Sequence, residues 1–88
     1  MDKQAFKELG HYLREKRIKK DLTQVDVAEK LGYRSQFIAN WERGASSPPI
    51  EALKKLIGIY GISQKEIMNT LCGLQSDYWK RNLFSKKR

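Results

Sequence analysis

The sequence has little of several residue types on which covalent chemistry, metal binding or membrane insertion depends. Its 88 residues include one cysteine and one histidine, which excludes an internal disulfide and any metal site built from several such ligands. Apolar runs are only a few residues long, whereas a membrane-spanning helix needs about 20. The first residues carry mixed charge, so no signal peptide is expected.

Motifs for catalysis and phosphate cradling are missing as well. The chain has no GxSxG, no glycine-rich phosphate loop and no HExxH. We therefore expect no enzymatic activity, no cofactor and no metal. The scarcity of cysteine fits a reducing compartment, so we expect a cytoplasmic protein that does not enter a membrane.

Positive charge, by contrast, is abundant. Eighteen Lys and Arg stand against ten Asp and Glu, a net charge of +8. Residues 79–88 hold five bases and no acid (+5), which leaves +3 for residues 1–78 (thirteen bases minus ten acids). Such a balance suits a polyanion, most simply nucleic acid, although a solvated face is the alternative.

Apolar residues recur at spacings of three and four, and the period-two alternation of strands is absent. This pattern predicts an all-α fold, with helices over residues 3–20, 24–31, 34 or 35 to 42 or 43, 49–60, and 64 to 71 or 72. Thr23 with Asp26 and Ser63 with Glu66 have the spacing of capping boxes. Glycines are expected to end three of these helices, at Gly32, Gly44 and Gly61.

Two short helices joined by a glycine-led turn are typical of a helix-turn-helix. Ala28 is small where the helices would cross, and Ile38 and Trp41 would anchor the second helix from below. The opposite face of that helix is polar and rich in amides, which can bind adenine bidentately in a major groove. It carries Ser35, Gln36, Phe37, Asn40 and Arg43.

From about residue 9 to residue 68 the chain resembles the phage Cro and repressor helix-turn-helix family, also called the xenobiotic-response-element family. The matching segments are Leu13-Arg14, Arg17, Leu22-Thr23-Gln24, Val27-Ala28-Glu29-Lys30-Leu31-Gly32, Ile38-Ala39-Asn40-Trp41-Glu42-Arg43-Gly44, Pro48, Leu53-Lys54-Lys55-Leu56 and Tyr60-Gly61-Ile62-Ser63. The resemblance implies a compact five-helix DNA-binding domain that binds double-stranded DNA as a homodimer.

The resemblance also assigns roles to individual residues. It places four at base-contacting positions: Arg34, Ser35, Gln36 and Asn40. It places three at phosphate-contacting positions: Thr23, Gln24 and Arg43, with Gln24 also bracing the recognition helix. It implies a structural ion pair, partly buried between the first and third helices: Arg17 and Glu42.

Three residues depart from the family pattern. Arg34 stands where a small capping residue is usual, so either Ser35 caps the helix or Arg34 itself reaches DNA. Phe37 stands where a small residue is common, and it could contact a thymine methyl, pack on Tyr33 or meet a partner. Asp21 replaces a usual glycine, which predicts modest backbone strain.

The chain divides into a domain of residues 1–72 and an extension of residues 73–88. Gly73 interrupts the pattern, and Ser76 or Asp77 could cap a sixth helix whose basic end is frayed. Its apolar residues would fold back on the domain, form the dimer interface or contact something else. These residues are Tyr78, Trp79, Leu83 and Phe84.

The resulting hypothesis is a dimeric repressor that reads an inverted-repeat operator through the Ser35–Arg43 helix. The alternative is a protein-interaction module on the same fold, such as an antitoxin-like partner of another protein. A phage repressor, an antitoxin and a restriction–modification controller all remain compatible with the sequence.

Overall fold

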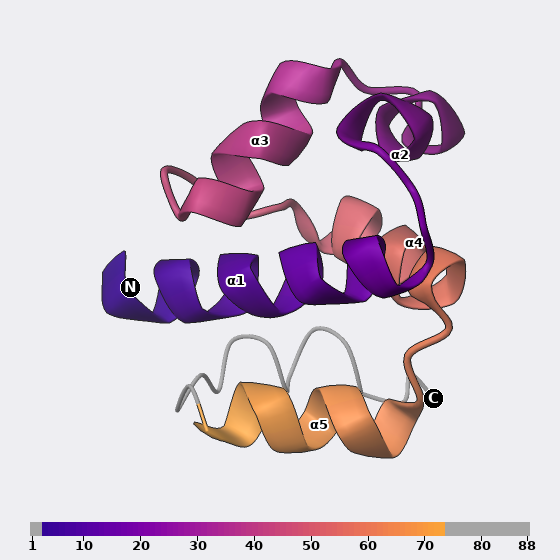
Figure 1. Ribbon diagram of the computed structural model, residues 1–88. Coiled ribbons are helices and arrows are strands. Elements are labelled where there is room, and N and C mark those ends of the chain that lie inside the picture. Colours follow the sequence, from indigo (N-terminus) through magenta and orange to yellow (C-terminus); the bar gives the residue numbers. More distant parts are fainter. Residues whose placement is uncertain (1–2, 74–88) are drawn as a thin grey trace.

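A computed structural model describes residues 3–73 of the chain (Figure 1). This part is built of five α-helices, with no strand between residues 3 and 73. Their bounds are α1 Lys3–Lys19, α2 Gln24–Leu31, α3 Ser35–Arg43, α4 Ile50–Tyr60 and α5 Gln64–Gly73. The all-α, five-helix prediction is confirmed, and no helix end differs from its predicted position by more than two residues.

Helix α1 is the element around which the others are arranged. In Figure 1, α3 lies on one side of α1 and α5 on the other, while α2 sits beside α3 and α4 passes behind α1. The central core draws side chains from all five helices and one turn: Leu9, Leu13, Val27, Ala28, Leu31, Ile38, Trp41, Ala52, Leu53, Leu56, Tyr60, Ile62 and Ile67. Among the described helices, none has the length and apolar character that crossing a membrane requires.

Local chemistry explains where the helices begin and end. Gly32, Gly44 and Gly61 follow α2, α3 and α4 in left-handed conformations, as predicted. Asp21, directly after the first helix and its turn, adopts a φ of 62°, a region that costs a non-glycine residue some strain.

The alternative in which Ser35 caps α3 was wrong, and so was the expected start of the fourth helix at Pro49. Ser35 is the first residue of α3 and not its cap; Arg34 holds the N-cap position, without a side-chain cap bond. Pro49 likewise precedes α4 as its N-cap instead of lying in its first turn. In both cases the N-cap residue has an extended backbone conformation and makes no side-chain hydrogen bond to the first turn of the helix.

The two expected capping boxes differ. Thr23 Oγ1 accepts from the Asp26 N–H at 3.0 Å and Asp26 Oδ2 accepts from the Thr23 N–H at 2.9 Å, so the first box is complete. Ser63 Oγ accepts from the Glu66 N–H at 3.0 Å. The Glu66 carboxylate, however, accepts from the Tyr12 hydroxyl at 2.8 Å and pairs with Lys16, both on α1.

Gly10 marks a close approach between α1 and α3 that sequence reasoning missed. A Cβ atom at this position would lie 2.2 Å from the Trp41 carbonyl oxygen and 2.7 Å from that of Glu42. Those oxygens belong to backbone and cannot swing aside. Gly10 falls on the same helical face as Leu13 and Arg17, so its place on the buried stripe was the available signal.

Candidate nucleic-acid interface

Helices α2 and α3 form the helix-turn-helix, and the turn between them is fixed by backbone bonds. The N–H groups of Gly32 and Tyr33 both donate to the Ala28 carbonyl at 2.9 Å. Gly32 can close this turn because its φ of 78° suits glycine. Ala28 is buried on the inner side of α2 and Ile38 on that of α3, so the packing leaves the opposite face of α3 turned outward.

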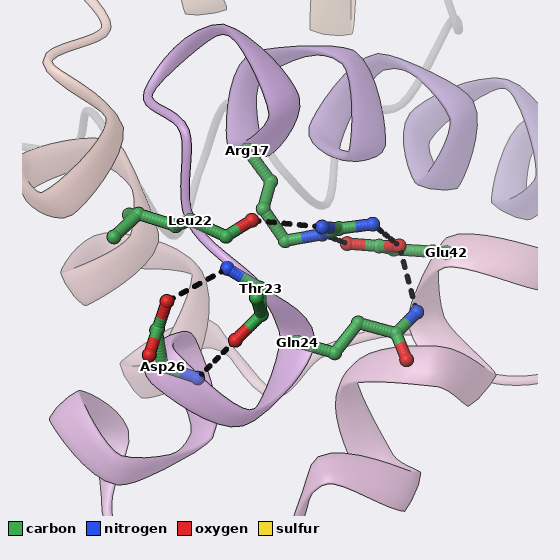
Figure 2. Close-up of polar contacts among 6 residues, drawn as sticks. All are labelled: Arg17, Leu22, Thr23, Gln24, Asp26 and Glu42. Atoms are coloured by element: carbon green, nitrogen blue, oxygen red, sulfur yellow. Dashed lines mark hydrogen bonds and ion pairs between the residues drawn. The ribbon is translucent and has the colours of Figure 1, made fainter.

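A buried polar cluster ties both helices to α1 (Figure 2). Arg17 donates twice to Glu42, from Nε to Oε2 at 2.7 Å and from Nη2 to Oε1 at 3.1 Å. Its Nη1 donates to the Leu22 carbonyl at 2.9 Å. Gln24, at the first position of α2, donates from Nε2 to Glu42 Oε1 at 3.1 Å. One carboxylate on α3 thus receives donors from α1 and from α2.

The electrostatics of this cluster are those of a satisfied ion pair. Hydrogen bonding to Glu42 raises the pKa of the Arg17 guanidinium, against the opposing effect of burial. Burial raises the pKa of the neighbouring Tyr60 hydroxyl, and the Glu42 charge adds to that shift. No buried side-chain nitrogen or oxygen in the described part of the chain lacks a hydrogen-bond partner. The cluster therefore positions α1, α2 and α3 relative to one another.

The residues assigned to base contacts lie on or beside the outward face of α3. Gln36 and Arg34 are exposed, whereas Ser35 and Asn40 are half-buried. Arg43, one turn beyond Asn40, is exposed and donates from Nη2 to Asn40 Oδ1 at 2.6 Å. These side chains lie along the whole of α3, from Arg34 at its N-cap to Arg43 at its last position. Ile38 and Trp41 are buried on the other face.

The residues assigned to phosphate contacts keep donors available after their internal bonds. Thr23 uses its hydroxyl oxygen as an acceptor for the Asp26 N–H, which leaves its O–H free to donate. Gln24 gives one amide hydrogen to Glu42 and retains the other. Arg43 gives one of its five N–H groups to Asn40. These groups suit an acceptor-only ligand such as a phosphate oxygen.

Phe37 settles into one of the three arrangements considered for it. Its ring meets Tyr33 edge-on, with centroids 5.6 Å apart. It nevertheless remains among the exposed large apolar residues of the described part. Although Phe37 packs on Tyr33, much of its side chain therefore stays exposed to solvent.

Two further expectations concern metals and the C-terminal extension. Within residues 3–73, no group of three or more His, Cys, Asp or Glu side chains is placed to hold a metal ion. The apolar residues of the extension lie outside the described residues: Tyr78, Trp79, Leu83 and Phe84. The predicted sixth helix also lies outside the described residues. Gly73, which was expected to interrupt the helical pattern, is the last residue of α5.

Comparison with known proteins bears on this arrangement. A family model described as helix-turn-helix matches residues 13–67. The cryptic phage CTXphi transcriptional repressor RstR of Vibrio cholerae is 32% identical over 57 residues, 65% of this chain and 51% of that protein. The HTH-type transcriptional regulator ImmR of Bacillus subtilis (strain 168) is 38% identical over 55 residues, 62% and 43% of the two chains. The matches thus span about half the length of these curated relatives. No solved structure matches the chain.

Proposed function

Since the chain belongs to the helix-turn-helix family of the phage Cro and repressor type, we propose that it is a DNA-binding transcriptional regulator, a repressor that reads its operator through α3. One observation carries the proposal. The buried cluster of Arg17, Gln24 and Glu42 fixes α3 so that its amide-bearing face points outward. Such a face, lying in a major groove, can hydrogen-bond to base edges.

In this proposal, base readout and phosphate binding are separate tasks. Gln36 and Asn40 read bases, together with Arg34 and Ser35 at the start of α3. Thr23, Gln24 and Arg43 hold the phosphate backbone and so fix the register of the helix in the groove. Phosphate binding rests on the free donors described above, which remain after Thr23, Gln24 and Arg43 have each made an internal bond.

The operator is an inverted repeat bound by a homodimer. Its half-sites lie about one helical turn apart, roughly 34–36 Å. The apolar residues Tyr78, Trp79, Leu83 and Phe84 form the contact between protomers in this proposal. Its support is their sequence, because four large apolar side chains in a short segment are seldom left in water. Sedimentation of Trp79→Ala tests it: a dimer of unchanged affinity would remove this segment from the interface.

Selection from a random duplex pool at about 150 mM salt, where exposed charges are screened, tests the central proposal. We expect an enriched inverted repeat. Gln36→Ala should then lose about 1–3 kcal/mol on that operator and little on random DNA. Gln64→Ala is the matched control, because Gln64 is an exposed glutamine on α5, across α1 from α3 (Figure 1).

Salt titration separates the phosphate contacts from base readout. Arg43→Ala should reduce the slope of log K against log salt by about 1, whereas Lys65→Ala on α5 should leave it unchanged. No enriched sequence, together with binding that fades steeply as salt rises, would contradict sequence-specific regulation. A protein partner would then be the object to search for.

A further inference from the structure

An aromatic cluster supports an exposed ring on the DNA-facing side of α3. Tyr33, Phe37 and Trp41 follow one another at intervals of four residues. The ring centroids of Tyr33 and Trp41 are 5.2 Å apart and those of Phe37 and Trp41 are 6.5 Å apart. Trp41 is 3% exposed, whereas Phe37 is 46% exposed. The cluster therefore runs from the core to the surface, where the Phe37 ring packs against Tyr33 and Trp41.

Asn40 lies three residues beyond Phe37, so the two side chains are neighbours on the helix surface. Its Oδ1 accepts from Arg43 Nη2 at 2.6 Å. Because arginine can only donate, this contact fixes which end of the amide is engaged. The contact uses one of the two lone pairs of Oδ1, while both N–H donors of the Asn40 amide keep their full capacity for a ligand.

This pair has the chemistry of one base edge in particular. Adenine, in its bidentate pairing with asparagine, needs both an acceptor and a donor from the amide. Thymine instead presents an acceptor, O4, beside an apolar C5-methyl group. An amide with both N–H groups free, next to an exposed aromatic ring, complements thymine at both points, whereas adenine would have to share Oδ1 with Arg43.

We propose that Phe37 and Asn40 together recognise a thymine in each half-site, the Phe37 ring covering the C5-methyl and the Asn40 amide donating to O4. Arg43 is a positioning residue here, since it orients Asn40 while its remaining N–H groups bind phosphate. The inference rests on the proposed function and specifies one base that α3 reads.

Four pyrimidines separate the two contacts. At each thymine of the selected operator in turn, the base is replaced by uracil, 5-methylcytosine or cytosine, the latter two paired with guanine. Thymine against uracil, and 5-methylcytosine against cytosine, each isolate the methyl group. Thymine against 5-methylcytosine changes the O4 acceptor to an N4 donor. Affinity is measured by fluorescence anisotropy at fixed salt.

At one thymine per half-site, we expect removal of the methyl to weaken binding about three- to tenfold in both pairing backgrounds, since burial of one methyl contributes that much. Phe37→Ala should bring both methyl ratios to about 1, while Phe37→Leu keeps part of them. Ile18→Ala, the matched control at an apolar α1 residue that is likewise half-exposed, should keep them in full. Asn40→Ala should preserve the methyl ratios and reduce the preference for thymine over 5-methylcytosine.

Each contrary result has a distinct meaning. If the natural protein binds thymine and uracil operators alike at every position, or if the methyl ratios survive in Phe37→Ala, the methyl contact is wrong. A preference for thymine over 5-methylcytosine that survives Asn40→Ala overturns the O4 contact. Failure to select any operator overturns the proposed function and this inference with it, whereas an operator with dispensable methyl groups overturns the inference alone.

Discussion

Two glutamates join α1 to other helices, and they do so in different surroundings. Glu42, on α3, has a side chain 4% exposed and pairs with Arg17, whose side chain is 11% exposed. Glu66, on α5, is 39% exposed and pairs with Lys16 at 22%. Arg17 binds Glu42 through two hydrogen bonds, and Glu42 also accepts one from Gln24. Glu66 accepts a further hydrogen bond from the Tyr12 hydroxyl, whose pKa is raised by burial to about 12.

The difference indicates that α3 is held against α1 more firmly than α5 is. At the contact between α1 and α3, which we call a seam, the buried Glu42 carboxylate accepts from three donor groups. At Gly10 the two backbones come so close that even a Cβ atom would overlap α3. The seam between α1 and α5 relies on apolar burial of Ile67, with its polar contacts near the surface. Surface pairs are screened and add little, whereas a buried pair cannot lose one partner without penalty.

The largest expected effect is that of Glu42→Gln. Removal of this charge leaves the Arg17 guanidinium in a buried site without a carboxylate, which should cost about 3–5 kcal/mol of unfolding free energy. Urea denaturation measures the loss. Replacing both partners with apolar residues, as Arg17→Met with Glu42→Leu, should recover part of it, because the buried charge is then gone. If Glu42→Gln were no more costly than Glu66→Gln, the contrast between the two seams would not hold.

Gly10→Ala tests the close backbone approach between α1 and α3. Its Cβ would overlap the Trp41 and Glu42 carbonyl oxygens, so the helices must separate, at a cost of about 1–3 kcal/mol. Gly58, inside α4, is the control because a Cβ there meets nothing within 4 Å. Gly58→Ala should stabilise the protein by about 0.5–1 kcal/mol, since glycine is disfavoured in a helix interior. Thermal melting of the two variants should therefore move in opposite directions.

A smaller contrast separates the caps of α2 and α5. Thr23→Ala removes one half of a reciprocal pair and should cost about 1–2 kcal/mol, while Ser63→Ala removes a single bond and should cost about 0.5–1 kcal/mol. Denaturant unfolding of the two variants compares these losses directly. Equal losses would mean that the hydroxyl of the complete box contributes no more to stability than the single cap bond of Ser63.

The smallest effect is expected for Glu66→Gln, and it is measured as the pH dependence of the unfolding free energy. Hydrogen bonds from Lys16 and Tyr12 lower the pKa of this carboxyl below its usual range. A carboxyl with a lowered folded-state pKa stabilises the fold above its unfolded pKa of about 4.3 and ceases to do so as the pH falls through the folded value. The stability difference between the natural protein and Glu66→Gln should thus vanish in acid and shrink in salt. A difference that persists at low pH would show that the charge is not its source.

Sequence patterns predicted the helices and their ends because both depend on neighbours in the chain. Thr23 and Asp26 formed the expected box, since Asp26 stands three positions after Thr23 and both bonds of the box are made within this one turn. Glu66 has the same spacing from Ser63, but α1 offers its carboxylate a hydroxyl and an ammonium group. The approach at Gly10 depends in the same way on how α3 crosses α1, which local spacing does not specify. The base and phosphate contacts assigned to α2 and α3 remain predictions.

Along α3, the residues that hold the helix and those that face outward occupy different sides of one short segment. Ile38, Trp41 and Glu42 are committed to the domain, whereas Gln36, Asn40 and Arg43 bond to nothing in the core. Mutation can consequently alter the outward set without unfolding the protein. If α3 reads bases as proposed, its sequence preference can change on a constant scaffold, so two descendants of this chain could bind different DNA sequences with nearly identical folds.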